Sequence, residues 1–198
     1  NSLLNPVAVS IVTVVLLLMA THTPINLLSG AQFIHFLLGP TTVALAVPLY
    51  DLRFSWLKIG YRFYLGLFAG AFTAITSTVL IAGLLGASPE TIISLAPKSV
   101  TTPIAMSIAE KLGGLPASLL PWVVLTGVLG RSAQDSVPAS KVDSSSAKGF
   151  ALGLSAHGMG TSRAFQMIDG RAYGSLAIGL TGLTTALLAP LLTPLLMK

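Results

Sequence analysis

The stretch APKSVTTPIA, Ala96–Ala105, places a lysine between two prolines in a chain that is otherwise strongly apolar. Proline interrupts a helix because it lacks a backbone N–H and its ring clashes with the preceding turn. Two short helices are therefore expected here, one closed by Pro97 and one that begins at Thr101 or Thr102 with Pro103 in its first turn. Each would have about ten residues, which is half the thickness of a membrane core.

Charge is scarce in this chain. Of its 198 residues 53% are hydrophobic and 9% charged, whereas soluble domains carry roughly 25% charged residues. Residues 1–50, 63–89, 112–130 and 172–197 contain no Lys, Arg, Asp or Glu. Each window is long enough for a membrane-spanning helix, and one soluble core could not bury them all. The sequence predicts a single all-α polytopic membrane domain over residues 1–198, with about six membrane segments and a re-entrant or broken-helix hairpin.

The composition also excludes several classes of protein. The net charge of +5 comes from basic residues in short loops between apolar segments, so it indicates membrane topology and not nucleic-acid binding. The absence of cysteine excludes disulfides, thiolate catalysis and cysteine metal sites. The first residues have no basic n-region and do not resemble a signal peptide. No nucleophile elbow or metal-ligand cluster is present, so no enzymatic activity is expected.

The remaining elements follow from apolar runs and helix breakers. Ser88 is expected to cap the first short helix, with Pro89 at its first position and Glu90 beside its positive end. Gly113 and Gly114 are expected to end the second short helix. Longer helices are expected at 3–20, 63–85, 116–130 and 172–189, interrupted segments at 30–50 and 149–168, and a solvated polar loop at 131–148.

Topology is predicted from the basic loops. The loops 51–62 and 131–148 each contain three Lys or Arg, which places both on the cytoplasmic side. The chain between them must then cross an even number of times, so 89–112 is expected to dip into the membrane and return, or to count as two half-crossings. The interrupted segment 30–50 would run inward and the segment 149–168 outward. That order predicts an inverted repeat with a discontinuous helix in each half.

Lys98 is the first candidate for ligand binding. A lysine in the middle of a membrane is costly and usually faces a cavity or a partner. The helix break beside it also leaves backbone amides unpaired and presents the positive end of a helix dipole. With the hydroxyls of Ser99, Thr101 and Thr102, this is the chemistry of a carboxylate site. Alternatively, Lys98 extends to the membrane interface from an ordinary turn.

The stretch SAHGMGTSRA, Ser155–Ala164, is the second candidate. Gly158 and Gly160 permit a tight backbone, Thr161 offers a hydroxyl, and Arg163 can hold a carboxylate in bidentate fashion. His157 can take up a proton near neutral pH. The alternatives are that His157 is a satisfied core residue and that Arg163 is an interfacial charge.

A third candidate is GPTTVALAVP, Gly39–Pro48. Thr41 and Thr42 follow a Gly-Pro break and could donate hydrogen bonds to a ligand. Alternatively, this is a kinked packing helix whose threonines bond to their own backbone.

These stretches together resemble a known family. The strings FLLGPTTVALAVPLY, ASPE, LAPKSVTTPIAM, GGLPA, LTGVLG and KGFALGLSAHGMGTSRA are similar to those of the LrgB/CidB membrane proteins, and the resemblance runs from about Leu3 to Pro190. Family members usually have one more N-terminal helix, so this sequence looks as if it begins late. They also typically continue an apolar helix where this chain has RSAQDSVPASKVDSSS.

The resemblance implies two kinds of function. Some members are carriers of small carboxylates such as pyruvate, glycolate and glycerate, and others are described as holin-like or antiholin-like regulators of murein hydrolase activity, lysis and programmed cell death. The buried lysine among broken helices favours a secondary transporter of small monocarboxylates, with the regulator as the alternative. The site residues would be Lys98, Ser99, Thr101, Thr102, His157, Gly158, Gly160, Thr161, Arg163, Thr41 and Thr42.

The same resemblance implies the surroundings of the protein. It would be an integral protein of a bacterial plasma membrane, form a homo-oligomer and work with an LrgA/CidA-type membrane partner. Its ligands would be a small carboxylate and the lipid bilayer, with no nucleic acid. No cofactor or metal site is expected, and the coupling ion would be H⁺ or Na⁺.

Overall fold

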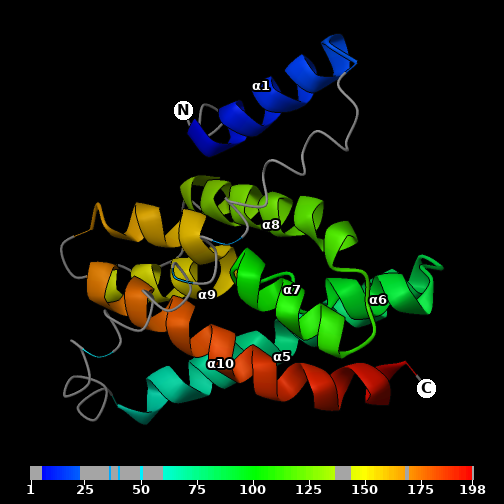
Figure 1. The fold of residues 1–198 in the computed structure, drawn as a ribbon. Coiled ribbons are helices and arrows are strands. Elements are labelled where there is room, and N and C mark those ends of the chain that lie inside the picture. The colour runs from blue at the N-terminus through cyan, green and yellow to red at the C-terminus, as the bar shows by residue number, and fades with distance from the viewer. Residues whose placement is uncertain are drawn as a thin grey trace.

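The computed structural model describes residues 6–22, 36, 40, 50, 60–136, 144–167 and 170–197. Over this part of the chain the protein is all-helical and contains no strand, as predicted (Figure 1). The helices are α1 (Pro6–Ala20), α5 (Tyr61–Leu84), α6 (Pro89–Leu95), α7 (Thr102–Lys111), α8 (Pro116–Ser136), α9 (Ser145–Ala164) and α10 (Gly170–Leu196).

Two of the described helices, α5 with 24 residues and α10 with 27, are long and apolar enough to cross a membrane. They lie side by side (Figure 1). Large apolar side chains are exposed on both helices. On α10 the exposed leucines recur every four residues, which places them on one stripe: Leu183, Leu187, Leu191 and Leu195. Such a face is suited to a hydrocarbon environment.

The α10 helix is longer than predicted. The sequence indicates an end near Ala189 because Pro190 and Pro194 follow it, yet the helix continues to Leu196. That part of the prediction is wrong. Both proline rings lie on the exposed side of the helix, while Ala189 and Thr193 are buried against its neighbours. Packing of the buried side therefore maintains the helix through two positions that lack an N–H donor.

The two short helices form a hairpin, here called hairpin 1, which comprises α6, the turn at 96–100 and α7. Its helices have 7 and 10 residues, and the predicted half-length helices are confirmed. Ser88 caps α6 by accepting a bond from the N–H of Thr91 at 3.3 Å, as predicted. Leu95 and Ala96 at the turn, and Ile108 beyond it, pack into one apolar cluster with α5 and α10.

The base of hairpin 1 is closed by Ser94 and the Gly113-Gly114 pair. Ser94 is fully buried; its hydroxyl donates to the carbonyl of Glu90 at 2.6 Å and accepts from the N–H of Leu115 at 2.7 Å. Gly113 has a positive φ of 84°, which glycine adopts without strain. A Cβ at Gly114 would lie 2.8 Å from the Ser94 hydroxyl, so only glycine lets the chain pass this closely.

α9 is also a hairpin, here called hairpin 2. Its helical dihedrals fail at Ala156 (φ −127°, ψ 18°) and His157 (φ 40°, ψ −129°), where the sequence predicts a break. A Cβ at Gly160 would lie 2.2 Å from the carbonyl oxygen of Leu152. Residues eight apart in a straight helix are separated by about 12 Å along the axis. The arm 158–164 therefore folds back along the arm 145–155.

Hairpin 2 corrects the predicted path of the chain. The interruption of segment 149–168 is confirmed, but its expected outward crossing is wrong, because the segment returns to the end from which it entered. The first arm runs parallel to α5, where Gly66 contacts Phe150 and Gly70 contacts Leu154. It also runs parallel to α10. The sequence could not show this reversal because it gives the position of a break and not its angle.

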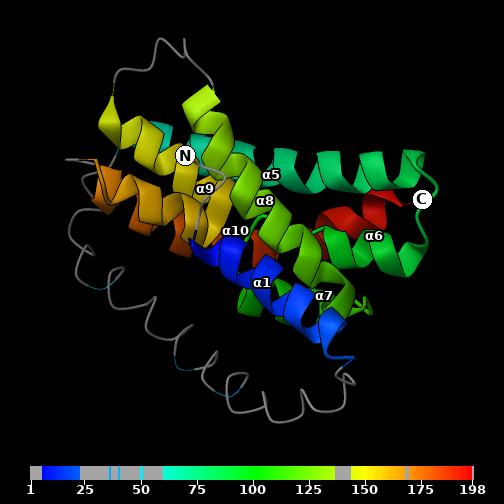
Figure 2. The ribbon, with the colours of Figure 1, turned by 90° about the horizontal axis from the view of Figure 1, so that it is seen from above.

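The two hairpins enter the bundle from opposite ends (Figure 2). Hairpin 1 follows the C-terminal end of α5, whereas hairpin 2 follows the C-terminal end of α8. α8 passes both of them: Leu119 packs with Ala109 in hairpin 1, and Gly130 meets Ala156 in hairpin 2. The turns of the two hairpins consequently approach each other near the middle of the bundle.

The predicted polar loop 131–148 is shorter than expected. α8 continues to Ser136 and α9 already begins at Ser145, so the loop boundaries at both ends were wrong. Ser144 caps α9 by accepting a bond from the N–H of Ala147 at 3.4 Å. Arg131 extends from the last turns of α8 to the hydroxyl of Ser162 at 3.2 Å. Arg131 thus connects the last turns of α8 to hairpin 2.

The predicted N-terminal helix is confirmed as α1 over Pro6–Ala20. Figure 1 shows it set apart from the other described helices, and nearly all of its described side chains are exposed. The interrupted segment 30–50 and the basic loop 51–62 lie largely outside the described residues.

Candidate functional site

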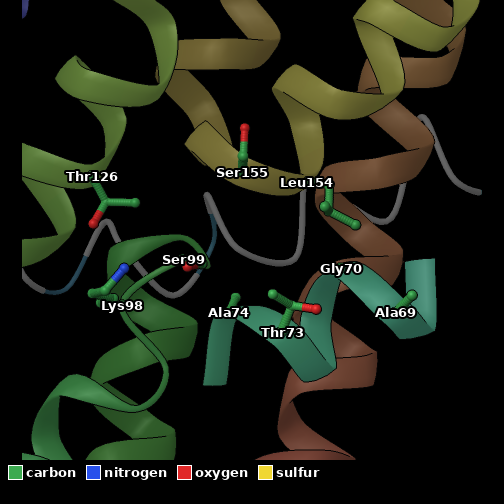
Figure 3. Close-up of a pocket in the computed structure, with 9 residues that line it drawn as sticks. All are labelled: Ala69, Gly70, Thr73, Ala74, Lys98, Ser99, Thr126, Leu154 and Ser155. Atoms are coloured by element: carbon green, nitrogen blue, oxygen red, sulfur yellow. The ribbon is translucent and has the colours of Figure 1, made fainter. Parts of the chain in front are cut away.

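An open cavity of about 460 Å³ lies between the turns of the two hairpins. Hairpin 1 contributes Lys98 and Ser99, and hairpin 2 contributes Leu154 and Ser155 (Figure 3). The remaining walls come from the middle of α5 and α8, with Ala69, Gly70, Thr73, Ala74 and Thr126. The cavity therefore has one lysine, four hydroxyl residues and small apolar side chains.

Lys98 is held in place by the turn of hairpin 1. Its N–H donates to the carbonyl of Leu95 at 3.0 Å, and the N–H of Val100 donates to the carbonyl of Pro97 at 3.2 Å. Pro97 and Val100 are buried, while Lys98 is only half-buried and extends towards Thr126 of α8 (Figure 3). The two prolines of the motif thus fix a compact turn whose one long polar side chain faces the cavity.

The start of α7 adds partial positive charge near Lys98. Thr101 is the N-cap, with φ −62° and ψ 146°, but its side chain makes no capping bond. Pro103 in the first turn has no N–H to satisfy. The unpaired amides at a helix start and the aligned peptide dipoles attract anions. Lys98, the buried Ser99 and this helix start are therefore suited to an anionic oxygen group.

His157 lies at the turn of hairpin 2 and fixes it to α8. Its Nε2 is 2.8 Å from the carbonyl oxygen of Val123, and the ring is buried. A Cβ on Gly127 would lie 2.7 Å from Cε1 of the same ring. The positive φ of 40° is rare for a side-chain-bearing residue and costs about 1–3 kcal/mol. The bond to the Val123 carbonyl and the close packing of the ring on Gly127 hold His157 in this strained conformation.

The other predicted residues of SAHGMGTSRA are Gly158, Gly160, Thr161 and Arg163, and none of them lines the cavity. Thr161 donates to the carbonyl of His157 at 2.8 Å, and Gly160 lets the two arms of hairpin 2 touch. Gly158 is exposed. Arg163 is half-buried near the end of the second arm and donates to the side chain of Gln166.

Of the residues predicted from the sequence, Lys98 and Ser99 lie at the cavity. Thr102 is the first residue of α7 and is half-buried. Thr41 and Thr42 lie outside the described residues. Of the two basic residues predicted to bind a carboxylate, Lys98 lines this cavity and Arg163 does not.

Two polar residues of the cavity, Thr73 and Thr126, were missed by sequence reasoning, and Ser155 belongs to the second candidate stretch but was not named as a ligand. Thr73 and Thr126 lie inside long helices, where a threonine in an apolar run gives no local signal. Thr126 does belong to the string LTGVLG, whose glycines Gly127 and Gly130 pack against the turn of hairpin 2. A short string of small residues inside a long apolar helix was the signal that could have indicated a close approach of another segment.

The fold and the cavity define a class: over the described residues, a helical protein with two helices long and apolar enough to cross a membrane, and a lysine-containing cavity between opposed helical hairpins. The chain belongs to the LrgB-like family, whose model matches residues 1–195.

Several relatives match nearly the whole chain. The uncharacterized protein YwbG of Bacillus subtilis is 37% identical over 192 residues, which covers 95% of this chain and 85% of YwbG. The uncharacterized protein YxaC of the same organism is 32% identical over 190 residues, covering 95% of this chain and 80% of YxaC. The holin-like protein CidB of Staphylococcus epidermidis is 27% identical over 200 residues, covering 97% and 85%. No solved structure matches.

Proposed function

We propose that this protein is a secondary transporter of small monocarboxylates that binds its substrate in the cavity between the hairpins. The observation that carries this proposal is the position of Lys98, which extends from the turn of a broken-helix hairpin into a cavity in the middle of the bundle. A lysine at membrane depth is costly and usually serves a ligand or a partner charge. A monocarboxylate supplies one compensating negative charge.

The proposed binding mode uses the described walls. The carboxylate lies against Lys98, the Ser99 hydroxyl and the start of α7. The hydroxyls of Thr126 and Thr73 on the facing walls are available to a second oxygen of a 2-oxo or 2-hydroxy acid. The apolar side chains of Ala69, Ala74 and Leu154 enclose the short carbon chain. A volume of about 460 Å³ lies within the usual range of small-ligand pockets.

The arrangement of the hairpins supports alternating access. α5 with hairpin 1, and α8 with hairpin 2, are two helix-plus-hairpin units that run in opposite directions. We assign these two units as an inverted repeat, in place of the pairing of segments 30–50 and 149–168. In transporters built from inverted repeats the substrate site lies at the interface of the repeats, and motion of one against the other exposes it to each side in turn.

Orientation follows from charge at the two ends of the bundle. Arg62 lies in the first turn of α5 and Arg131 in the last two turns of α8, and Lys148 and Arg171 lie in the first turns of α9 and α10. Ring contacts of Phe63 with Phe150 and Tyr173, with centroids 4.6 and 6.2 Å apart, bring these helix ends together. The basic end therefore faces the cytoplasm, in a bacterial plasma membrane.

The test is flux into proteoliposomes with the full-length protein. Pyruvate and glycolate are compared with a neutral sugar of similar size. We expect saturable uptake of the acids alone, at least about tenfold slower in Lys98→Ala, because a charge-assisted bond contributes about 1.5–3 kcal/mol. Lys111→Ala, at the exposed end of the same hairpin, is the matched control and should transport normally. Uptake that Lys98→Ala leaves unchanged would refute the assignment.

The second candidate function is a holin-like or antiholin-like regulator that acts with a smaller LrgA/CidA-type membrane partner. The similarity to CidB, named a holin-like protein, favours it. In this case solutes would pass by size, and the sugar would leak as fast as the acids. Homo-oligomers are expected for either function, and neither requires an enzymatic step or a cofactor.

A further inference from the structure

Leu154 is the one large apolar side chain among the described residues that line the cavity between the hairpins. The other walls are a lysine, hydroxyl residues, alanines and a glycine. Figure 3 shows Lys98 on one side of the cavity, and Leu154 with Gly70 on the other. The cavity therefore has a charged side, which suits a carboxylate, and an apolar side, which suits a carbon chain.

Helix α5 separates these two sides. Ala96, two residues before Lys98, belongs to the same apolar cluster as Ile75 of α5. Leu154 of hairpin 2 lies against the same helix at Gly70. Residues 70 and 75 are separated by about 7.5 Å along the helix axis. A carboxylate beside Lys98 thus has room for a chain of only a few carbon atoms before the chain reaches Leu154.

The contact between Gly70 and Leu154 fixes the position of the apolar wall. A Cβ on Gly70 would lie 2.4 Å from Cδ2 of Leu154, 3.0 Å from Cδ1 and 3.2 Å from Cγ. The branched end of Leu154 therefore rests directly on the backbone of α5. A side chain at position 70 would take its place. Because both residues line the cavity, the displaced leucine would move into it.

This wall has a direct effect on binding. Each methylene of a ligand that leaves water for apolar surroundings increases affinity about fourfold. The gain ends where the chain meets Leu154. A further carbon must then displace a packed side chain, and that displacement is unfavourable. Affinity should consequently rise with chain length while there is room, and fall beyond it.

We infer that Leu154 sets the chain length of the carboxylate that the cavity accepts, and that Gly70 sets the position of Leu154. The two residues determine specificity through volume alone, while Lys98 supplies the charge. The inference rests on the proposed function, because it concerns a wall of the same cavity. Short acids bind to the protein, and longer straight-chain acids are excluded from it.

The test measures binding and flux separately with the full-length protein, using straight-chain 2-oxo acids from pyruvate to 2-oxohexanoate. Binding is followed in detergent by the rise in thermal melting temperature with acid concentration, at constant ionic strength. Flux of the radiolabelled acids is followed in proteoliposomes. The variants are Leu154→Ala, Gly70→Ala and the double variant. Leu187→Ala, on the exposed stripe of α10, and Gly83→Ala, where a Cβ meets nothing within 4 Å, are the matched controls.

We expect Leu154→Ala to bind 2-oxohexanoate at least about tenfold more tightly than the parent protein does, with little change for pyruvate. Gly70→Ala should shift the preference the other way and weaken 2-oxobutyrate about tenfold relative to the parent. In the Leu154→Ala background the Gly70 substitution should have no such effect, because the leucine that it displaces is absent. Both controls should keep the preference of the parent.

One chain-length preference shared by the parent, Leu154→Ala and Gly70→Ala would overturn the inference, and saturable pyruvate uptake would still support the transporter. The expected shifts in binding without flux of any acid would keep the inference and refute the transporter. Absence of binding by every acid would refute both. The two substitutions act in opposite directions, so either one decides the question if the other prevents folding.

Discussion

Substitution of Gly153 by alanine tests the path of hairpin 2. The first arm of the hairpin and α10 touch through four glycines, Gly149 and Gly153 on one side and Gly170 and Gly174 on the other. A Cβ on Gly153 would lie 2.4 Å from the carbonyl oxygen of Gly174, and one on Gly149 would lie 2.3 Å from that of Gly170. Both contacts are with backbone, which cannot rotate away.

The magnitude follows from two opposing terms. Alanine is favoured over glycine inside a helix by about 1 kcal/mol. Against this, ordinary contact begins near 3.4 Å, so the two helices must separate by about 1 Å at Gly153. Overpacking of this kind costs about 1–3 kcal/mol, and a backbone-to-backbone clash belongs at the upper end. We expect Gly153→Ala to reduce the free energy of unfolding by about 2 kcal/mol.

The assay is unfolding in mixed micelles with increasing SDS, followed by circular dichroism. Gly83→Ala on α5 is the control, because a Cβ there meets nothing within 4 Å and only the favourable helix propensity remains. We expect this variant to be as stable as the parent or slightly more so. Equal stabilities of Gly153→Ala and Gly83→Ala would show that hairpin 2 does not pack against α10 as described.

Two further substitutions test the turns themselves. Ser94→Ala removes the buried hydroxyl that accepts from the N–H of Leu115 and should cost about 1 kcal/mol in the same unfolding assay, whereas Ser107→Ala on the exposed face should be near neutral. His157→Gly and His157→Ala lose the same bond to α8, but only glycine accepts the positive φ, so the glycine variant should be the more stable by about 1–2 kcal/mol. A more stable alanine variant would mean that His157 is not strained.

Hairpin 1 could be predicted from the sequence because its signals are local. Ser88 and Pro89 define a helix start, Pro97 and Pro103 fix the break, and the glycine pair at 113–114 ends the hairpin. Each acts through backbone chemistry within a few residues, so the helix bounds were predicted to within one or two positions. Lys98 was predicted as a site residue by the same reasoning, because a charged side chain beside a helix break in an apolar chain usually faces a cavity or a partner.

Hairpin 2 could be predicted only in part, because its direction depends on distant contacts. SAHGMG indicates a break, but a kink and a reversal leave the same local pattern. What selects the reversal is the carbonyl of Val123 for His157 and the glycines of α10 for the first arm. The same applies to Thr73 and Thr126, which reach the cavity only because hairpin 2 does not continue as a crossing helix.

Val123 contacts both hairpin turns. This connection between the turns favours a carrier over a pore of fixed size. Its side chain packs in a cluster with Val100 at the turn of hairpin 1, while its carbonyl accepts the bond from His157 in hairpin 2. A shift of either hairpin turn therefore disturbs Val123, which also contacts the other turn. A pore that passes solutes by size requires no such connection between opposed turns. A transporter requires it, because only one turn at a time should leave its place beside α8.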